Sequence, residues 1–237
     1  MGKLERFGNF SSSEIWKLTT KGKDKDSFGK PALTYISEKQ MEMRLCRPLS
    51  IEHGAKETSW GILVENRVHE LLPMNYKLST TQRLQHPTIS NWVGIPDVII
   101  QDGDVKIVGD IKCPYSLKSF CTSVDLLGDV EVFKAELPEY YWQLVSNCIL
   151  VGAKIAEIIF YVPYQKELSD IRELAENWDG DQNKFAFLNW ANDSDLPYLI
   201  EGKYYKNLNI FRFEVPQSDI DYLTNRVELA VNILNNN

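Results

Sequence analysis

The chain has 237 residues, of which 43% are hydrophobic and 25% are charged, and its formal net charge is −7. This composition is typical of a globular protein with a sizeable core, and the length suits one domain, with or without an insertion. No apolar run approaches the ~20 residues that a membrane-spanning helix needs, and the N-terminus has no apolar signal segment. We therefore expect a cytoplasmic protein with no membrane segment.

The cysteines and histidines do not predict a zinc site. Cys46, Cys113, Cys121 and Cys148 form no CxxC pair, and the three histidines form no HExxH motif. We expect four reduced, mostly buried thiols.

The acidic net charge by itself argues against a nucleic-acid-binding protein, which is usually basic. The charge is uneven, however, because residues 17–30 carry five lysines and only two aspartates. Such a segment can contact phosphates, and it can equally be a solvated loop.

The N-terminal half predicts helices and one weak strand. Ser11-Ser12-Ser13-Glu14 before an apolar run predicts a helix start, and a polar loop follows from Lys21 to Pro31. The next helix is expected over Ala32–Leu45. Thr58 is the expected N-cap of another helix, whose apolar residues recur at helical spacing to Leu72. Tyr76–Leu84 is the weak strand candidate.

A β-hairpin is predicted over residues 97–112. Val98-Ile99-Ile100 is a short apolar strand, Asp102-Gly103-Asp104 is a turn signal, and the second strand runs from Val105 to Lys112. We therefore expect Asp97, at the start of the first strand, to lie near Asp110 on the second.

The C-terminal half continues the alternation of helices and strands. Helices are expected over Tyr140–Val151, Glu167–Trp178 and Ser218–Leu234, and strands over Ile155–Val162 and Leu208–Val215. Residues 179–207 give no clear pattern. The mixture predicts an α/β or α+β domain in which helices flank a central sheet.

Asp97, Asp110 and Lys112 are the candidate chemical residues. Alternate side chains of a strand share a face, so Asp110 and Lys112 point the same way while Ile111 points into the core. Two carboxylates suit Mg²⁺, and a lysine beside them can orient water or stabilise charge on a reacting phosphate. Asp97 can instead be a turn residue, and Asp110 and Lys112 an exposed ion pair, but their apolar strand makes an exposed pair harder to explain.

Several motifs resemble those of the phage lambda exonuclease / YqaJ-type viral recombinase family, within the PD-(D/E)xK nuclease superfamily. The matching segments, in chain order, are Arg6 with Ser13, Trp60-Gly61-Ile62-Leu63-Val64-Glu65, Pro96-Asp97, Asp110-Ile111-Lys112-Cys113-Pro114-Tyr115 and Tyr140-Tyr141-Trp142-Gln143. Each motif alone is weak, but their common order makes coincidence improbable. The resemblance runs from about residue 6 to 163 and resumes weakly in the last strand and helix.

The resemblance implies a restriction-endonuclease-like α/β fold in a single domain of residues 1–237, with an inserted subdomain or lid near 164–207. It also implies an Mg²⁺- or Mn²⁺-dependent exonuclease that degrades duplex DNA from 5′ to 3′ in phage or prophage recombination. The implied assembly is a homotrimeric ring, and a single-strand annealing protein is the implied partner.

The resemblance also gives roles to individual residues. Asp97, Asp110 and Glu65 would hold the metal, Lys112 would orient the nucleophilic water, and Gln143 would approach the catalytic centre. Arg6, Ser13 and Lys118 would contact DNA; Lys118 can equally be a free surface lysine. The sequence departs from the lambda enzyme at Ile95, which replaces a serine that contacts phosphate, and at Asp110, which replaces a glutamate.

Two alternatives stay open at the level of sequence. One is an endonuclease of the same superfamily, and the other is a non-catalytic protein that binds DNA ends.

Overall fold

The computed structural model describes residues 7–24, 26–49, 55–73, 76–78 and 83–236. A five-stranded mixed sheet lies at its centre, in the order β2-β5-β6-β7-β8, and only the β6–β7 pair is parallel. Its strands are β2 (Tyr76–Leu78), β5 (Val98–Asp102), β6 (Val105–Lys112), β7 (Ile155–Tyr161) and β8 (Leu208–Glu214). The predicted hairpin and the mixed sheet are therefore confirmed.

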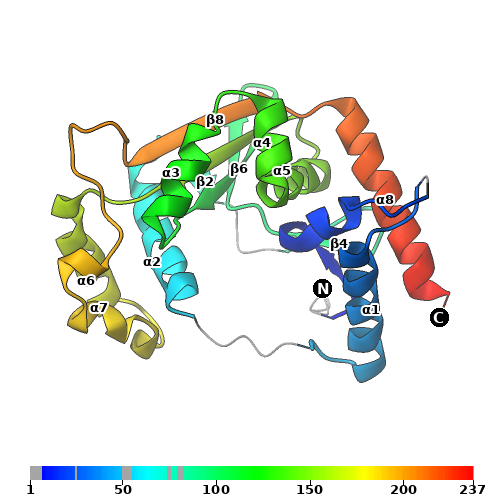
Figure 1. Cartoon of the computed structure of the whole chain (residues 1–237), viewed down its shortest axis with the longest axis horizontal. Helices are drawn as coiled ribbons and strands as arrows, with labels where there is room; N and C mark the ends of the chain where they lie inside the picture. Colours follow the sequence, from blue (N-terminus) through cyan, green and yellow to red (C-terminus); the bar gives the residue numbers. More distant parts are fainter. Residues whose placement is uncertain (1–6, 25, 50–54, 74–75, 79–82, 237) are drawn as a thin grey trace.

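Helices cover both faces of this sheet, and each face has its own hydrophobic core (Figure 1). The first core packs under α1 (Lys30–Leu45), α3 (Leu117–Asp125), α4 (Val130–Glu136), α5 (Pro138–Val151) and α8 (Gln217–Asn235). The second packs under α2 (Lys56–Leu71), α6 (Leu168–Glu176) and α7 (Ala186–Trp190). Because strand residues alternate, Val108 faces the first core while Ile107 and Ile111 face the second.

A second, three-stranded sheet in the order β1-β4-β3 stands beside α1. Its strands are β1 (Phe10–Ser11), β3 (Leu84–Gln85) and β4 (Trp92–Gly94). Trp92 is fully buried there, and the chain leaves β4 only three residues before Asp97. This small sheet therefore fixes the approach of the chain to the candidate site.

Some predicted boundaries are wrong. The predicted helix start at Ser11 is confirmed, and the helix is a 3-10 helix, η1 (Ser12–Thr19), with Ser11 as its N-cap. The cap of α2 is Ala55, so Thr58 lies inside the first turn. The strand predicted from Tyr76 ends at Leu78 among the described residues. The helix predicted over Tyr140–Val151 is confirmed as α5, and Gly152 ends it with a φ of 73°.

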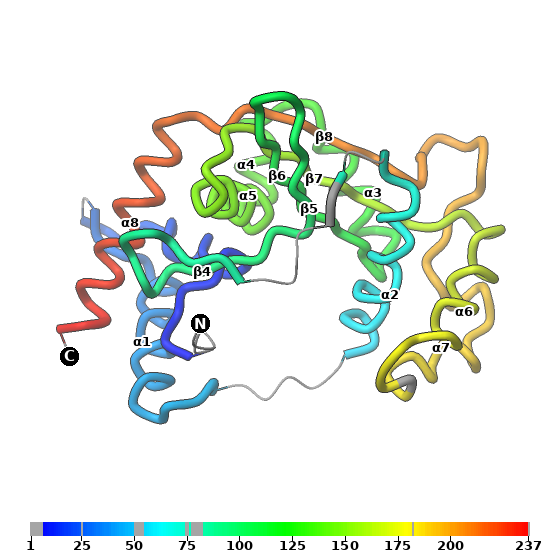
Figure 2. The backbone as a smooth tube through the Cα atoms, turned by 180° about the vertical axis from the view of Figure 1, so that it is seen from behind, coloured from blue at the N-terminus to red at the C-terminus, as the bar shows by residue number. Residues whose placement is uncertain are grey.

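Residues 164–207 lie between β7 and β8 and contain η2 (Gln165–Glu167), η3 (Gln182–Phe185) and η4 (Asp193–Asp195) besides α6 and α7. This segment packs on α2 through apolar side chains and an ion pair of 3.5 Å between Arg67 and Asp170. It thus forms the outer layer over one face of the sheet, as the tube of Figure 2 shows at the end opposite α8.

The lysine-rich segment is a short ordered turn in its described residues. Gly22 N donates to Ser27 O over 3.0 Å. The Arg226 guanidinium donates to the Leu18, Thr20 and Asp26 carbonyls. Lys25 lies outside the described residues. Arg226 therefore ties this turn to α8.

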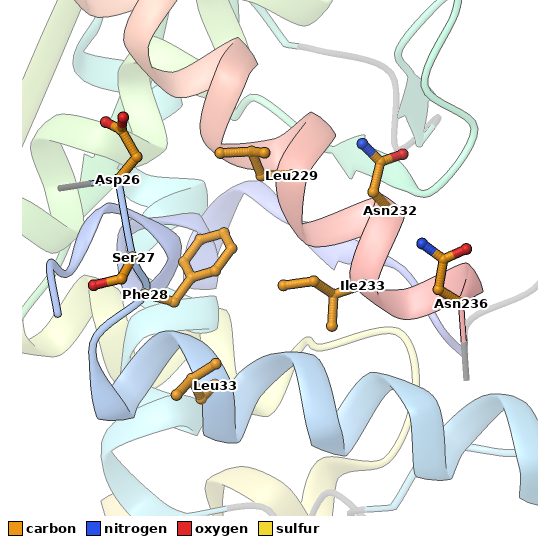
Figure 3. Close-up of a pocket in the computed structure, with 8 residues that line it drawn as sticks. All are labelled: Asp26, Ser27, Phe28, Leu33, Leu229, Asn232, Ile233 and Asn236. Carbon is orange, nitrogen blue, oxygen red and sulfur yellow. The ribbon is translucent and has the colours of Figure 1, made fainter. Parts of the chain in front are cut away.

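An apolar groove of about 430 Å³ lies between that turn, α1 and α8 (Figure 3). Its lining residues are Asp26, Ser27, Phe28, Leu33, Leu229, Asn232, Ile233 and Asn236. None of them is a predicted site residue, so the groove is separate from the candidate site.

Two expectations from composition have further outcomes. Among the four cysteines, all free, Cys148 is buried and Cys46 is exposed, so the expected burial of most thiols is only partly confirmed. No helix in the described ranges has the length and apolar character needed to cross a membrane.

Candidate active site

Strand pairing places Asp97 opposite Asp110. Val98 pairs with Gly109 across the β5–β6 hairpin, and Asp97 stands one residue before that pair. The Ile111 amide donates to Asp97 Oδ2 over 2.8 Å, which anchors the carboxylate on the neighbouring strand. The predicted convergence of the two aspartates is therefore present in the structure.

Asp110, Lys112 and Gln143 form a closed polar triangle. Lys112 Nζ lies 2.6 Å from Asp110 Oδ2. Gln143 Nε2 donates to Asp110 Oδ1 over 2.6 Å, and Lys112 Nζ donates to Gln143 Oε1 over 3.2 Å. Asp110 is fully buried, so its negative charge is stabilised by Lys112 and Gln143 and not by water. Although Oδ2 accepts no hydrogen bond within the described residues, the Lys112 ammonium is its ion-pair partner.

The carboxyl groups of this cluster interact strongly. Burial raises the pKa of Asp97 well above its usual range, and the nearby charges of Asp110 and Glu65 raise it further. The Lys112 ammonium and the Ile111 amide oppose this shift only in part. The cluster thus carries more negative charge than its single lysine offsets.

Lys112 remains protonated in this setting. Burial by itself would lower the pKa of its ammonium, but the charges of Asp110 and Asp97 outweigh that effect, so the net shift is upward. The ammonium also lies 5.1 Å from the centre of the Tyr140 ring, within cation–π range. A fixed positive charge therefore stands beside the two aspartates.

Glu65 approaches the cluster from the opposite face of the sheet. It lies on α2. Burial is the main cause of the raised pKa of both Asp97 and Cys113, and the charge of Glu65 raises both pKa values further. Its neighbour His69 is 3.9 Å away on the same helix. Glu65 is thus electrostatically part of the site without a hydrogen bond to the aspartates.

Helix α5 carries a polar stripe that continues from Gln143 into the interior. Ser146 Oγ accepts from Trp92 Nε1 over 2.8 Å and shares a hydrogen bond of 2.8 Å with Ser12 Oγ. Asn147 is fully buried, and neither amide atom has a hydrogen-bond partner among the described residues. The sequence signal for this stripe was the i, i+4 spacing of Gln143 and Asn147, but nothing in it indicated burial.

Gly94 shows why this packing is so close. A Cβ at this position would lie 2.2 Å from Ser12 Oγ and 2.6 Å from Asn147 Oδ1. Only glycine therefore lets η1, β4 and α5 meet at this point, directly before Asp97.

Ser13 and Lys118, the described residues that are predicted to bind DNA, share no hydrogen bond or ion pair with the cluster. Ser13 is exposed on η1, where its Oγ lies 3.2 Å from Ser11 Oγ. Lys118 is exposed in the first turn of α3. Arg6 lies outside the described residues. Trp60 and Trp142, which belong to two of the motifs, are both buried.

A divalent cation suits the chemistry of these residues. Among the described residues, the site has three carboxylates but only one lysine; the carboxylates belong to Asp97, Asp110 and Glu65. Hard oxygen ligands of this kind are those that Mg²⁺ prefers. In the described part of the chain, no three His, Cys, Asp or Glu side chains already form a complete ligand set. Instead, Lys112 and Gln143 occupy the oxygens of Asp110.

The fold is similar to that of solved bacterial exonucleases. An alkaline exonuclease of Laribacter hongkongensis matches with 16% identity and a TM-score of 0.60, over 97% of this chain and 89% of that one. A phage-related exonuclease of Haemophilus somnus 129PT matches with 16% identity and a TM-score of 0.61, over 95% and 93%. No protein-family model and no curated protein sequence matches the chain. The chain therefore shares the fold of these exonuclease structures, with the restriction-endonuclease-like core that its mixed sheet and flanking helices display.

Proposed function

We propose that this protein is a metal-dependent deoxyribonuclease that degrades duplex DNA from its ends. The observation that carries the proposal is the cluster of buried Asp110 with half-buried Asp97, Lys112 and Gln143 at the end of the β5–β6 hairpin. The structural neighbours support it, because they are named as exonucleases and their fold matches nearly the whole length of this chain.

Asp97, Asp110 and Glu65 are the residues that would hold Mg²⁺ or Mn²⁺. When bound, such an ion offsets charge on the phosphate and lowers the pKa of water. The Ile111 amide fixes Asp97, and Gln143 fixes Asp110 from the side of α5, so both carboxylates are oriented before any substrate arrives.

Lys112 is the chain's own positive charge at the site. Its Nζ is held between Asp110 and Gln143, and it can donate to a water or to a phosphate oxygen on the reacting group. Because a phosphodiester gains charge in the transition state, an ammonium that stays protonated stabilises that state more than the ground state.

The finer assignment is a 5′→3′ exonuclease that acts in phage or prophage recombination as a homotrimeric ring. In this assignment the enzyme leaves a 3′ single strand for an annealing protein. Ser13 and Lys118 are the described residues that would contact the DNA backbone, and both are exposed to solvent, as such a contact requires.

Digestion of a linear duplex labelled at either the 5′ or the 3′ end, beside a closed circle, tests the proposal. We expect Mg²⁺-dependent release of the 5′ label first, an intact circle, and full inhibition by EDTA. Degradation of the circle would instead indicate an endonuclease, and binding without degradation would indicate a non-catalytic end-binding protein.

A further inference from the structure

The segment before β8 presents an aromatic pair between two lysines, Lys203-Tyr204-Tyr205-Lys206. Tyr204 is 85% exposed, although large aromatic side chains are usually buried, and both lysines are exposed. Gly202, with a φ of +74°, allows the turn that leads into this segment. The motif interleaves basic and aromatic side chains on the surface.

Tyr205 anchors the segment and Tyr204 is displayed on top of it. The Tyr205 hydroxyl donates to Asp125 Oδ2 over 2.8 Å, and its ring packs edge-on against buried Phe120. The Tyr204 ring then packs edge-on against Tyr205, with 4.9 Å between the ring centres. A fixed ring stacks on a ligand at a lower entropic cost than a mobile one.

The charges around the segment favour an anionic ligand. Neither Lys203 nor Lys206 has a carboxylate within ion-pair distance in the described residues, while the adjacent Glu201 pairs with Lys166 over 2.5 Å. Asp125 accepts the hydrogen bond of the Tyr205 hydroxyl. Two lysines without an ion-pair partner among the described residues therefore flank the tyrosine pair in the sequence.

A polar pocket of about 500 Å³ joins this segment to the end of α3. Its lining residues are Val124, Asp125, Leu127, Tyr204, Tyr205, Lys206 and Asn209. A hollow beside an exposed ring gives an unpaired base both a stacking partner and space.

The pocket and the candidate active site are connected by α3. The helix begins at Leu117, five residues after Lys112, and its last turn lines the pocket. Nine helical residues span roughly 13 Å, and Lys118 is exposed in the first turn.

We propose that Tyr204, Lys203 and Lys206 form a binding site for single-stranded DNA. The Tyr204 ring would stack on an unpaired base, and the two lysines would contact the adjacent phosphates. A base inside a duplex has both faces covered by its stacked neighbours, so the ring fits an unpaired base of a single strand. The inference rests on the proposed nuclease function, for which this site would hold a strand at the end of α3.

Fluorescence anisotropy of a labelled short oligothymidylate, titrated with the full chain, tests the site. EDTA is present to prevent cleavage. We expect Tyr204→Ala to weaken binding about tenfold, the lower part of the range for loss of one stacked base, and Tyr204→Phe to retain it. The double variant Lys203→Ala/Lys206→Ala should reduce the slope of log K against log salt by about 1.4, or about 0.7 for each lost phosphate contact.

The matched controls use equally exposed residues elsewhere. Trp190→Ala removes an aromatic side chain that is 87% exposed on α7. Lys106→Ala/Lys154→Ala removes two exposed lysines at the opposite end of the sheet, where β6 and β7 begin. Both controls should bind the oligonucleotide like the wild type.

Oligonucleotide affinity that is unchanged in Tyr204→Ala and in the double lysine variant would overturn the inference. The outcome is independent of the nuclease assignment, because binding is measured in EDTA, where a metal-dependent cleavage cannot occur. If duplex digestion fails while binding still depends on Tyr204, only the proposed nuclease function is wrong.

Discussion

At the scale of single residues, the site is defined by how few partners Asp110 has. Its carboxylate is fully buried and relies on one ammonium and one amide, both on long side chains that can move. A buried charge with so few partners lowers the stability of the folded state, so a functional role is the simplest reason for its presence. Predictions at this scale therefore concern the removal of one partner at a time.

Lys112→Ala should abolish cleavage and leave DNA binding largely intact. One lysine adds little to an interface with many phosphates, whereas loss of a charge-stabilising donor at a reacting centre typically costs about 10²–10³-fold in turnover. Single-turnover cleavage and a filter-binding assay measure the two effects. Lys106→Ala, which removes an exposed lysine near the start of β6, is the control and should keep its turnover. Wild-type turnover in Lys112→Ala would contradict the assigned role.

Asp110→Asn should weaken Mg²⁺ binding, because the neutral amide removes one of the three carboxylates at the site. Titration calorimetry without DNA measures the affinity, and circular dichroism verifies that the variant is folded. Asp125→Asn, a carboxylate on α3 that is engaged by Tyr205, is the matched control. An unchanged affinity in Asp110→Asn would show that Asp110 is not a ligand.

Cys148 should stay unreactive far into the alkaline range. Burial raises the pKa of its thiol to about 12, against about 8.5 for an exposed cysteine. A raised pKa favours the protonated form in the folded state. The stability it contributes is therefore present below about pH 8.5 and is lost as the pH rises towards 12. Alkylation mapped by mass spectrometry from pH 8 to 10 should modify exposed Cys46 and spare Cys148. Equal labelling of both thiols would show that this part of α5 opens.

At the scale of elements, the decisive junction is the point where η1, β4 and α5 meet. Gly94 lies at the centre of this junction, and the chain then passes through Ile95 and Pro96 to Asp97. A change in the packing of these three elements therefore alters the position of a site carboxylate.

Gly94→Ala should destabilise the protein and reduce its activity together. The added Cβ would lie 2.2 Å from Ser12 Oγ and 2.6 Å from Asn147 Oδ1, so the elements must separate. Overpacking of this kind typically costs about 1–3 kcal/mol, which urea denaturation measures. Gly103→Ala is the control for the loss of a glycine, because the same Cβ there meets no atom within 4 Å. Its φ of +58° makes some strain unavoidable, but activity should persist. If Gly94→Ala were as stable and active as the wild type, the junction would not position Asp97.

At the scale of the whole molecule, the acidic net charge of −7 must coexist with the proposed binding to DNA. Positive charge is nevertheless present near the candidate site. The exposed lysines at that end of the sheet include Lys118, Lys203 and Lys206. Binding by such local groups depends strongly on salt.

We expect a homotrimer, as the resemblance to lambda-type exonucleases implies. A cyclic trimer requires a contact between two different surface patches of each subunit. The segment 164–207 can supply or obstruct one of them, because it forms the outer layer beside α2. Light scattering at micromolar concentration, with and without a 5′-phosphorylated duplex, measures the mass. A monomer mass under both conditions would exclude the ring and indicate a distributive enzyme.

The sequence by itself determined the hairpin and the facing of its side chains. An apolar strand, a Gly-containing turn and a second strand fix the register, and the two-residue period of a strand places Asp110 and Lys112 on one face. The long helix α5 and the strands β7 and β8 were also predictable, because their apolar patterns extend over several periods.

The tertiary structure alone decided what surrounds these residues. The strands β1, β3 and β4 have two or three residues each, too few to show a period, and their sheet is completed by the pairing of β4 with β1 from a distant part of the chain. Sequence patterns did not indicate the burial of Asp110 or the double contact of Gln143, since both depend on how α5 crosses the sheet. Local patterns specify which side chains share a face, whereas the burial and partners of a side chain depend on elements far away in the sequence.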